Sequence, residues 1–109
     1  MVLLLAGPAR ATTLSTSSFL VTAAQNTWCN LTNLGKKPVT VTIDHVDLDS
    51  NVLSTFTLEI QPESSDTATF GGFGGLVRCR FSGKFSPKTV RAAALVLNGA
   101  ETTLSVPAQ

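Results

Sequence analysis

The segments PVTVTID (residues 38–44) and TFTLEI (residues 55–60) decide the fold that this chain of 109 residues is expected to adopt. In both segments apolar and polar side chains alternate, which is the pattern of a β-strand with one buried face. Between them, residues 47–51 (DLDSN) have short side chains that bond to neighbouring backbone groups and are typical of a turn. Asn51 is the residue expected to take the left-handed conformation there. The two segments therefore predict a β-hairpin.

Strand-like stretches continue on both sides of this hairpin, with no internal repeat and no linker between them. Threonine, valine and serine are abundant, and the first two favour strands over helices. A spacing of roughly ten residues from strand to strand is typical of an antiparallel β-sandwich. We predict an all-β, immunoglobulin-like antiparallel β-sandwich of about seven strands in a single domain, residues 12–109. Further strands are expected near residues 18–24, 27–32, 67–70, 76–82, 89–97 and 101–106.

Residues 87–97 are compatible with two structures. A helix would begin after an N-cap at Ser86 and end at a glycine. A strand would end at Asn98-Gly99, because both residues tolerate the positive φ of a type I′ hairpin turn. We favour the strand, since Lys88 in the first turn of a helix would oppose the helix dipole. Asn98 and Gly99 are then the two central residues of a tight turn.

The chain has two cysteines, Cys29 and Cys79, and alternation places both on the apolar side of their segments. Their wide separation excludes a CxxC redox motif, and two cysteines without further ligands do not make a closed zinc site. An even number of cysteines in an extracytoplasmic protein suggests pairing. We expect one disulfide that joins the two sheets, and two buried thiols are the alternative.

Residues 1–11 have the character of a signal-peptide remnant. The apolar run VLLLA (residues 2–6) is followed by Ala9-Arg10-Ala11, a small-x-small triplet of the kind that a signal peptidase recognises. The run is too short to cross a bilayer, which needs about 20 apolar residues, so no transmembrane segment is predicted. An ordinary N-terminal strand or tail is the alternative. We expect a protein that is secreted or periplasmic.

Four short motifs carry a resemblance to a known group of proteins: CN at 29–30, PVTV at 38–41, CRF at 79–81 and VRA at 90–92. With these motifs the chain resembles small bacterial secreted β-sandwich proteins of uncharacterised activity. The resemblance extends over residues 26–106. It implies a β-sandwich and export, and it implies no activity, cofactor or ligand.

Catalysis is not expected, because the residues that it needs are scarce. His45 is the only histidine, so a Ser–His or Cys–His arrangement would have to use it. Alternation from Ile43 points His45 toward the core or the end of the strand, where a packed or capping histidine is expected. No serine lies in a G-x-S-x-G motif. We therefore predict no enzyme activity.

Two loops start like ligand-binding motifs and then depart from them. The turn at 47–51 begins like a calcium loop, but Val52 replaces the glycine and Leu58 the glutamate that such a loop requires. The loop FGGFGG (residues 70–75) lacks the lysine and hydroxyl residue of a phosphate-binding loop. We predict no metal site and no cofactor. Phe73 is either packed beside its loop or exposed at the tip, where it would fit a partner's groove.

Charge is distributed unevenly, although the net charge is only +1 and gives no general reason to expect nucleic acid as a partner. Six acidic residues and no lysine or arginine lie between residues 44 and 66, and five basic residues and no acid lie between 78 and 91. Either these segments are neighbours whose charges pair, or the molecule stacks acidic face on basic face or binds an anionic polymer outside the cell.

The predicted strand near residues 89–97 is apolar on both faces from Ala92 onward, whereas a half-buried strand has a polar outer face. Another part of the chain or another molecule must therefore cover the second face. If that face is open, Leu95 and Leu97, flanked by Arg91, form a candidate partner surface together with Phe73.

These observations favour an exported binding or structural module that contacts an unknown protein partner or associates with itself. An accessory or inhibitor domain that presents its loops to a partner enzyme is the alternative.

Overall fold

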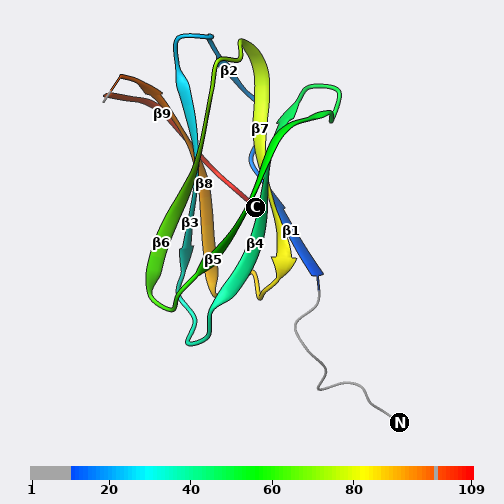
Figure 1. Cartoon of the computed structure of the whole chain (residues 1–109), viewed down its shortest axis with the longest axis vertical. Helices are drawn as coiled ribbons and strands as arrows, with labels where there is room; N and C mark the ends of the chain where they lie inside the picture. The colour runs from blue at the N-terminus through cyan, green and yellow to red at the C-terminus, as the bar shows by residue number, and fades with distance from the viewer. Residues whose placement is uncertain (1–10, 100) are drawn as a thin grey trace.

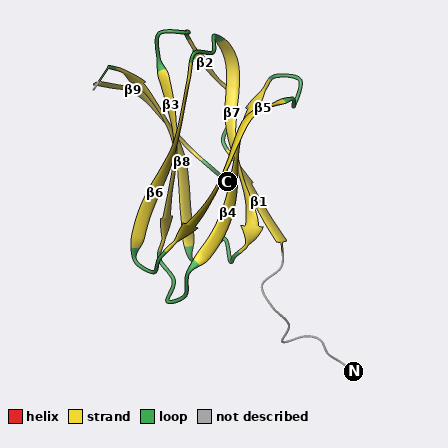
Figure 2. Cartoon of the chain, viewed as in Figure 1, coloured by secondary structure: helices red, strands yellow, loops and turns green. Residues whose placement is uncertain are grey.

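The structure is a computed structural model that describes residues 11–99 and 101–109, and these residues form two antiparallel sheets and no helix (Figure 1, Figure 2). The prediction of an antiparallel β-sandwich is confirmed, with nine strands in place of about seven. One sheet has the order β1-β7-β4-β5, with β2 also paired to β7, and the other has the order β6-β3-β8-β9. The strands are β1 (Ala11–Ser15), β2 (Phe19–Val21), β3 (Asn26–Asn33), β4 (Val39–Asp47), β5 (Val52–Ile60), β6 (Ser64–Gly71), β7 (Gly75–Lys84), β8 (Val90–Asn98) and β9 (Glu101–Pro107).

The two shortest strands include one that the sequence did not predict. β1 and β2 pair with successive parts of β7, so that Leu14 lies opposite Phe81 and Phe19 lies opposite Val77. Both Leu14 and Phe19 are buried. The prediction placed one strand near residues 18–24 and missed β1. Its sequence ATTLS contains a single large apolar residue and therefore shows no alternation.

The predicted signal-peptide remnant (residues 1–11) lies outside the described residues except for its last residue. Only Ala11 is described, and it is the first residue of β1, where it pairs with Lys84 of β7.

The predicted hairpin is β4–β5, in which Ile43 is fully buried and lies opposite Phe56. The Asp47 carboxylate closes the turn by accepting hydrogen bonds from the backbone N–H groups of Asp49 (2.9 Å) and Asn51 (2.8 Å). Ser50 has the positive φ of 66°, so the expectation for Asn51 is wrong. The side-chain amide of Asn51 also donates to Asp47, in addition to its backbone N–H. The residue with the left-handed conformation is therefore Ser50, one position earlier than predicted.

Residues 90–98 form strand β8, which confirms the strand over the helix. Gly99 has a φ of 66°, as the turn prediction requires. Asn98, however, pairs with Glu101 and has no positive φ, so the prediction that Asn98 is a central turn residue is wrong by one position. A register shift beside Val96 adds one residue to β9 and displaces the turn.

Replacement of Gly99 tests this turn. A Cβ at Gly99 would meet no atom within 4 Å, so the cost of Gly99→Val is the left-handed backbone and not a clash. We expect Gly99→Val to lower the free energy of unfolding by about 1–2 kcal/mol, whereas Gly99→Asn costs less because asparagine visits this conformation more readily. Urea denaturation measures both variants, and equal losses would contradict the assignment.

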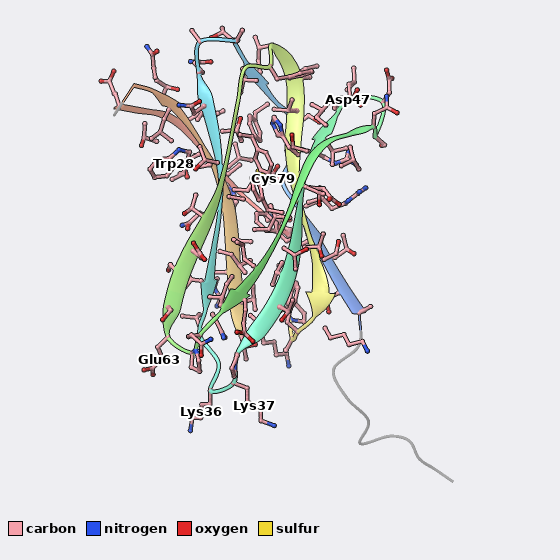
Figure 3. The ribbon with its side chains drawn as sticks, in the orientation of Figure 1. Trp28, Lys36, Lys37, Asp47, Glu63 and Cys79 are labelled. Carbon is pink, nitrogen blue, oxygen red and sulfur yellow. A yellow bond between two sulfur atoms is a disulfide. The ribbon has the colours of Figure 1, made fainter. Side chains whose placement is uncertain are left out.

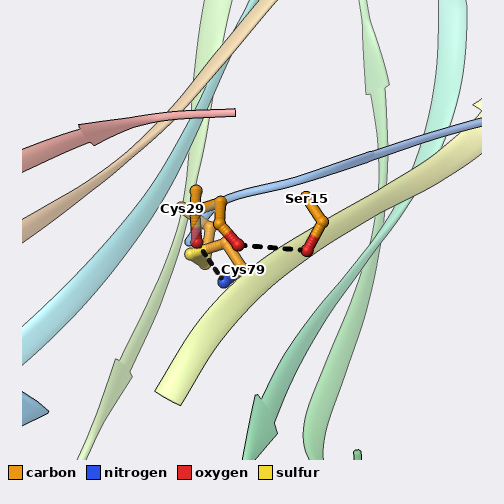
Figure 4. Close-up of a disulfide and its surroundings, with 4 residues drawn as sticks. Ser15, Cys29 and Cys79 are labelled. Carbon is orange, nitrogen blue, oxygen red and sulfur yellow. Dashed lines mark hydrogen bonds between the residues drawn. A yellow bond between two sulfur atoms is a disulfide. The ribbon is translucent and has the colours of Figure 1, made fainter. Parts of the chain in front are cut away.

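The two sheets are joined at the centre by the predicted disulfide between Cys29 of β3 and Cys79 of β7, with a Cα–Cα distance of 5.8 Å. Both cysteines are fully buried. The backbone N–H of Cys79 donates to Oγ1 of Thr16 (3.1 Å) beside the bridge (Figure 4). The carbonyl of Cys79 accepts from the backbone N–H of Thr16 (3.0 Å), so these two bonds attach the β1–β2 connection to β7. Large side chains fully buried in the sandwich include Leu31, Val41, Ile43, Val77 and Phe81.

Trp28 differs from the tryptophan of an immunoglobulin domain. In such a domain a buried tryptophan packs against the intersheet disulfide. Here Trp28 precedes Cys29 in β3, points to the opposite face of the sheet and is 37% exposed. The immunoglobulin-like part of the fold assignment stays a prediction.

Removal of the disulfide tests how strongly the core depends on it. The bridge closes a loop with a sequence separation of 50 residues. In the chain-entropy model such a loop contributes about 4 kcal/mol. We expect Cys29→Ala combined with Cys79→Ala to lower the free energy of unfolding by that order. The same loss is expected when the native protein is reduced. A loss below about 1 kcal/mol in both measurements would show that the unfolded chain gains little freedom without the bridge.

Candidate functional site

The candidate partner surface lies on the outer face of the β6-β3-β8-β9 sheet, around Leu95 of β8. Leu95 lies directly opposite Trp28 of β3 and Ser105 of β9, and Trp28 lies opposite Thr69 of β6. These four residues form one row across all four strands, which we call the Trp28 row. Leu95 is half-buried, and Thr69 and Ser105 are exposed. The centre of the row is therefore apolar and its two ends are polar.

Next to the Trp28 row the same face is polar and internally bonded. The hydroxyl of Thr67 donates to Oδ1 of Asn30 (3.0 Å), and the hydroxyls of Thr32 and Ser65 lie 2.6 Å apart. Arg91 is exposed opposite Thr32. An apolar centre with a polar, solvent-accessible rim is the general arrangement of protein contact surfaces.

Two of the other predicted members, Leu97 and Phe73, are not open surface residues. Leu97 is only 6% exposed, so the alternative of a covered position describes it. Phe73 is half-buried and packs against the core, with its ring centroid 6.1 Å from that of His45 in an edge-on arrangement. The packed alternative for Phe73 therefore describes the structure.

Sequence reasoning missed Trp28 as a surface residue, although the signal was present. The alternation that points Cys29 and Leu31 inward points the intervening and preceding residues outward. Trp28 must then lie on the outer face, and its partner across the β3–β8 pair is Leu95. The pairing itself depends on register between distant segments, which a single sequence does not show.

His45 is buried between the two sheets, as expected for a packed histidine. It is 3% exposed, lies opposite Cys79 on the adjacent strand, and stacks on Phe70 with ring centroids 4.7 Å apart. Its Nε2 is buried without a hydrogen-bond partner. Desolvation by burial lowers the pKa of His45 below its usual value.

The carboxylate adjacent to His45 in sequence does not share its site. Asp44 points to the other face of β4, where its Oδ2 accepts from Nη2 of Arg80 (2.9 Å) and its Oδ1 from the hydroxyl of Thr55 (2.6 Å). A base with a carboxylate to orient it is the usual arrangement for histidine-dependent catalysis. His45 and Asp44 do not form that arrangement.

The Asp44–Arg80 ion pair joins the acidic and the basic segments, because β4 and β7 are neighbours. Arg78 of β7 lies close enough to donate to the hydroxyl of Ser50 in the β4–β5 turn (3.4 Å). Hydrogen bonds from Asn51, foremost from its backbone N–H, lower the pKa of Asp47. The alternative in which the acidic segment (residues 44–66) and the basic segment (residues 78–91) are neighbours with paired charges therefore holds for Asp44 and Arg80.

Within residues 11–99 and 101–109, no group of three or more histidine, cysteine or acidic side chains is placed to hold a metal ion. The same residues contain no helix long and apolar enough to cross a membrane.

Comparison with protein-family models, with curated proteins and with solved structures finds no match. The architecture itself defines the class of protein: a small all-β sandwich of two antiparallel sheets with one intersheet disulfide.

The buried His45 predicts a pH dependence of stability. Its folded-state pKa lies below the ordinary value of 6.5, so the unfolded chain takes up a proton before the folded protein does. This contribution to stability is complete above pH 6.5 and is lost as the pH falls from 6.5 through the folded pKa. We expect urea midpoints measured from pH 7.5 down to pH 5.5 to fall more steeply for the wild type than for His45→Phe. Parallel curves would contradict a buried neutral histidine.

Proposed function

We propose that this protein is an exported binding module without catalytic activity, and that it contacts a protein partner through the Trp28 row. The observation that carries the proposal is the exposure of Trp28 beside the half-buried Leu95 on the outer face of the sheet. Tryptophan is among the residues that contribute most to protein contacts when a partner buries it.

The geometry around Trp28 favours a flat partner surface. The neighbours along and across the sheet are short side chains, such as Asn30, Thr67 and Ala93, so a partner can approach the indole closely. Burying the remaining exposed part of an aromatic side chain contributes roughly 1–2 kcal/mol from apolar area alone. The hydroxyl groups of Thr69 and Ser105 at the two ends of the row can then exchange water for hydrogen bonds with the partner.

The disulfide supports export, because such bonds persist in oxidising compartments such as the periplasm and the medium. The resemblance to small bacterial secreted proteins and the signal-peptide remnant point to the same compartment and stay predictions. A non-catalytic role is supported by the separation of His45 from Asp44 on opposite faces of β4.

A cross-linking experiment tests this proposal. The photoreactive residue p-benzoylphenylalanine replaces Thr69, which is exposed at one end of the Trp28 row. The matched control carries it at Thr57, which is exposed on the other sheet. We expect a cross-linked product from position 69 and none from 57 when the protein is irradiated in its native medium or periplasmic fraction. The mass of the product distinguishes a second copy of the chain from a different protein.

Substitution of Leu95, a member of the Trp28 row, tests whether the cross-linked product forms through the proposed surface. We expect Leu95→Lys to abolish the cross-link and to leave the melting temperature nearly unchanged, because Leu95 is half-buried and its side chain lies on the outer face. Leu20→Lys, at a leucine that is 68% exposed on the other sheet, is the control and retains the cross-link. The proposal is wrong if positions 69 and 57 cross-link equally, or if the product from position 69 persists in Leu95→Lys.

A further inference from the structure

A cleft of about 380 Å³ opens at one end of the sandwich, between the β3–β4 and β7–β8 connections. Pockets for small ligands usually have volumes of about 300–1,000 Å³ and combine apolar walls with a few polar groups. This cleft has both kinds of lining. Its apolar residues include Pro38, Val39 and Phe85, and its basic residues are Lys36, Lys37 and Lys84.

The wall of the cleft is held in shape by Asn33, a fully buried asparagine at the end of β3. Its Nδ2 donates to the carbonyl of Lys37 (2.7 Å), and its Oδ1 accepts from the backbone N–H of Gly35 (2.9 Å). The backbone N–H of Leu34 donates to the carbonyl of Thr89 (2.7 Å), which ties the β3–β4 connection to the β7–β8 connection. The two sides of the cleft are therefore fixed before any ligand arrives.

The lysines of the cleft have no anionic partner in the described part of the chain, where the only ion pair joins Asp44 to Arg80. Figure 3 shows Lys36 and Lys37 extending from the end of the molecule, far from the turn that contains Asp47. Glu63 lies at the same end but makes no ion pair with any of them. Three exposed lysines without an ion-pair partner among the described residues thus contribute to the lining of a partly apolar cleft.

A hydroxyl group at the cleft adds a hydrogen-bond donor. The Oγ of Ser86 accepts from the backbone N–H of Lys88 (3.2 Å), which leaves the hydroxyl hydrogen of Ser86 available to donate. Ser86 lines the cleft beside Phe85. Lysine ammonium groups with a nearby hydroxyl donor match phosphate, sulfate and carboxylate oxygens, which are acceptors.

From this arrangement we propose that the cleft binds an anionic group, a phosphate, sulfate or carboxylate, attached to a small apolar body. The anion lies among Lys36, Lys37 and Lys84, and the apolar body contacts Pro38 and Val39, which are more exposed than the buried Phe85. The site is separate from the Trp28 row, because it lies at an end of the sandwich and not on the outer face of a sheet.

Phenyl phosphate is a probe that carries both parts of this ligand, and benzyl alcohol is its uncharged counterpart. We expect titration of ¹⁵N-labelled protein with phenyl phosphate to shift the amide signals of Gly35, Phe85 and Thr89 in a saturable way. Benzyl alcohol should shift them far less. Raising the salt concentration should weaken the binding of phenyl phosphate, because the charges are exposed and salt screens them.

Two charge-matched variants make the test specific. Lys84→Gln removes a charge at the cleft, and Lys88→Gln removes one nearby from a residue that does not line it. We expect Lys84→Gln to weaken phenyl phosphate binding about tenfold, since a charge-assisted contact is lost, and Lys88→Gln to change it less than about twofold. Equal weakening by both variants would show a general attraction to positive charge and would overturn the site.

The anionic group could be presented by a soluble molecule or by a lipid headgroup, and vesicles distinguish these sources. Sedimentation with phosphatidylglycerol vesicles that is lost in Lys84→Gln and absent with phosphatidylcholine assigns a lipid. Binding of phenyl phosphate without vesicle binding assigns a soluble ligand. The proposal is wrong if neither probe binds. None of these outcomes changes the cross-link from position 69, so the two proposals fail independently.

Discussion

The covalent bond between Cys29 and Cys79 is the constraint on which the rest of the structure depends. It fixes β3 of one sheet against β7 of the other at the middle of the core, and both strands have neighbours on each side. Once Cys29 points inward, alternation fixes the face to which each of the remaining side chains of β3 points. Trp28 is then directed to the outer face, and Asn33 is directed to the interior at the end of the strand. The two surfaces to which we assign binding therefore both follow from the orientation of one strand.

The parts of the fold that could be predicted are those that local pattern controls. The β4–β5 hairpin and the inward direction of both cysteines follow from alternation within their segments. The β8 strand follows from the turn signal at Asn98-Gly99 and from Lys88, which disfavours a helix. β1 could not be found, because its one apolar side chain becomes informative only beside β7. The displaced turn at Gly99 has a similar cause, since the register shift next to Val96 arises between two strands and not within either one.

The candidate sites were harder to predict than the fold because each combines segments that are distant in the sequence. The Trp28 row takes one residue from each of four strands, and the cleft takes its lysines from the β3–β4 connection and from the end of β7. Local sequence showed an excess of basic residues between 78 and 91 but could not separate its members. The structure separates them by neighbour: Arg80 is paired with Asp44 across adjacent strands, whereas Lys84 lines a cavity.

The pairing of β1 and β2 with β7 has a consequence for the order of folding. A chain is synthesised from its N-terminus, so Ala11 is made long before Lys84, the residue opposite it in the sheet. Until β7 is complete, both early strands have unpaired backbone groups and no sheet to join. Contacts between such distant segments make folding slow compared with that of a fold built on local contacts. β1 and β2 thus remain without their partner strand until β7 exists, and any chaperone that assists folding would meet them in that interval.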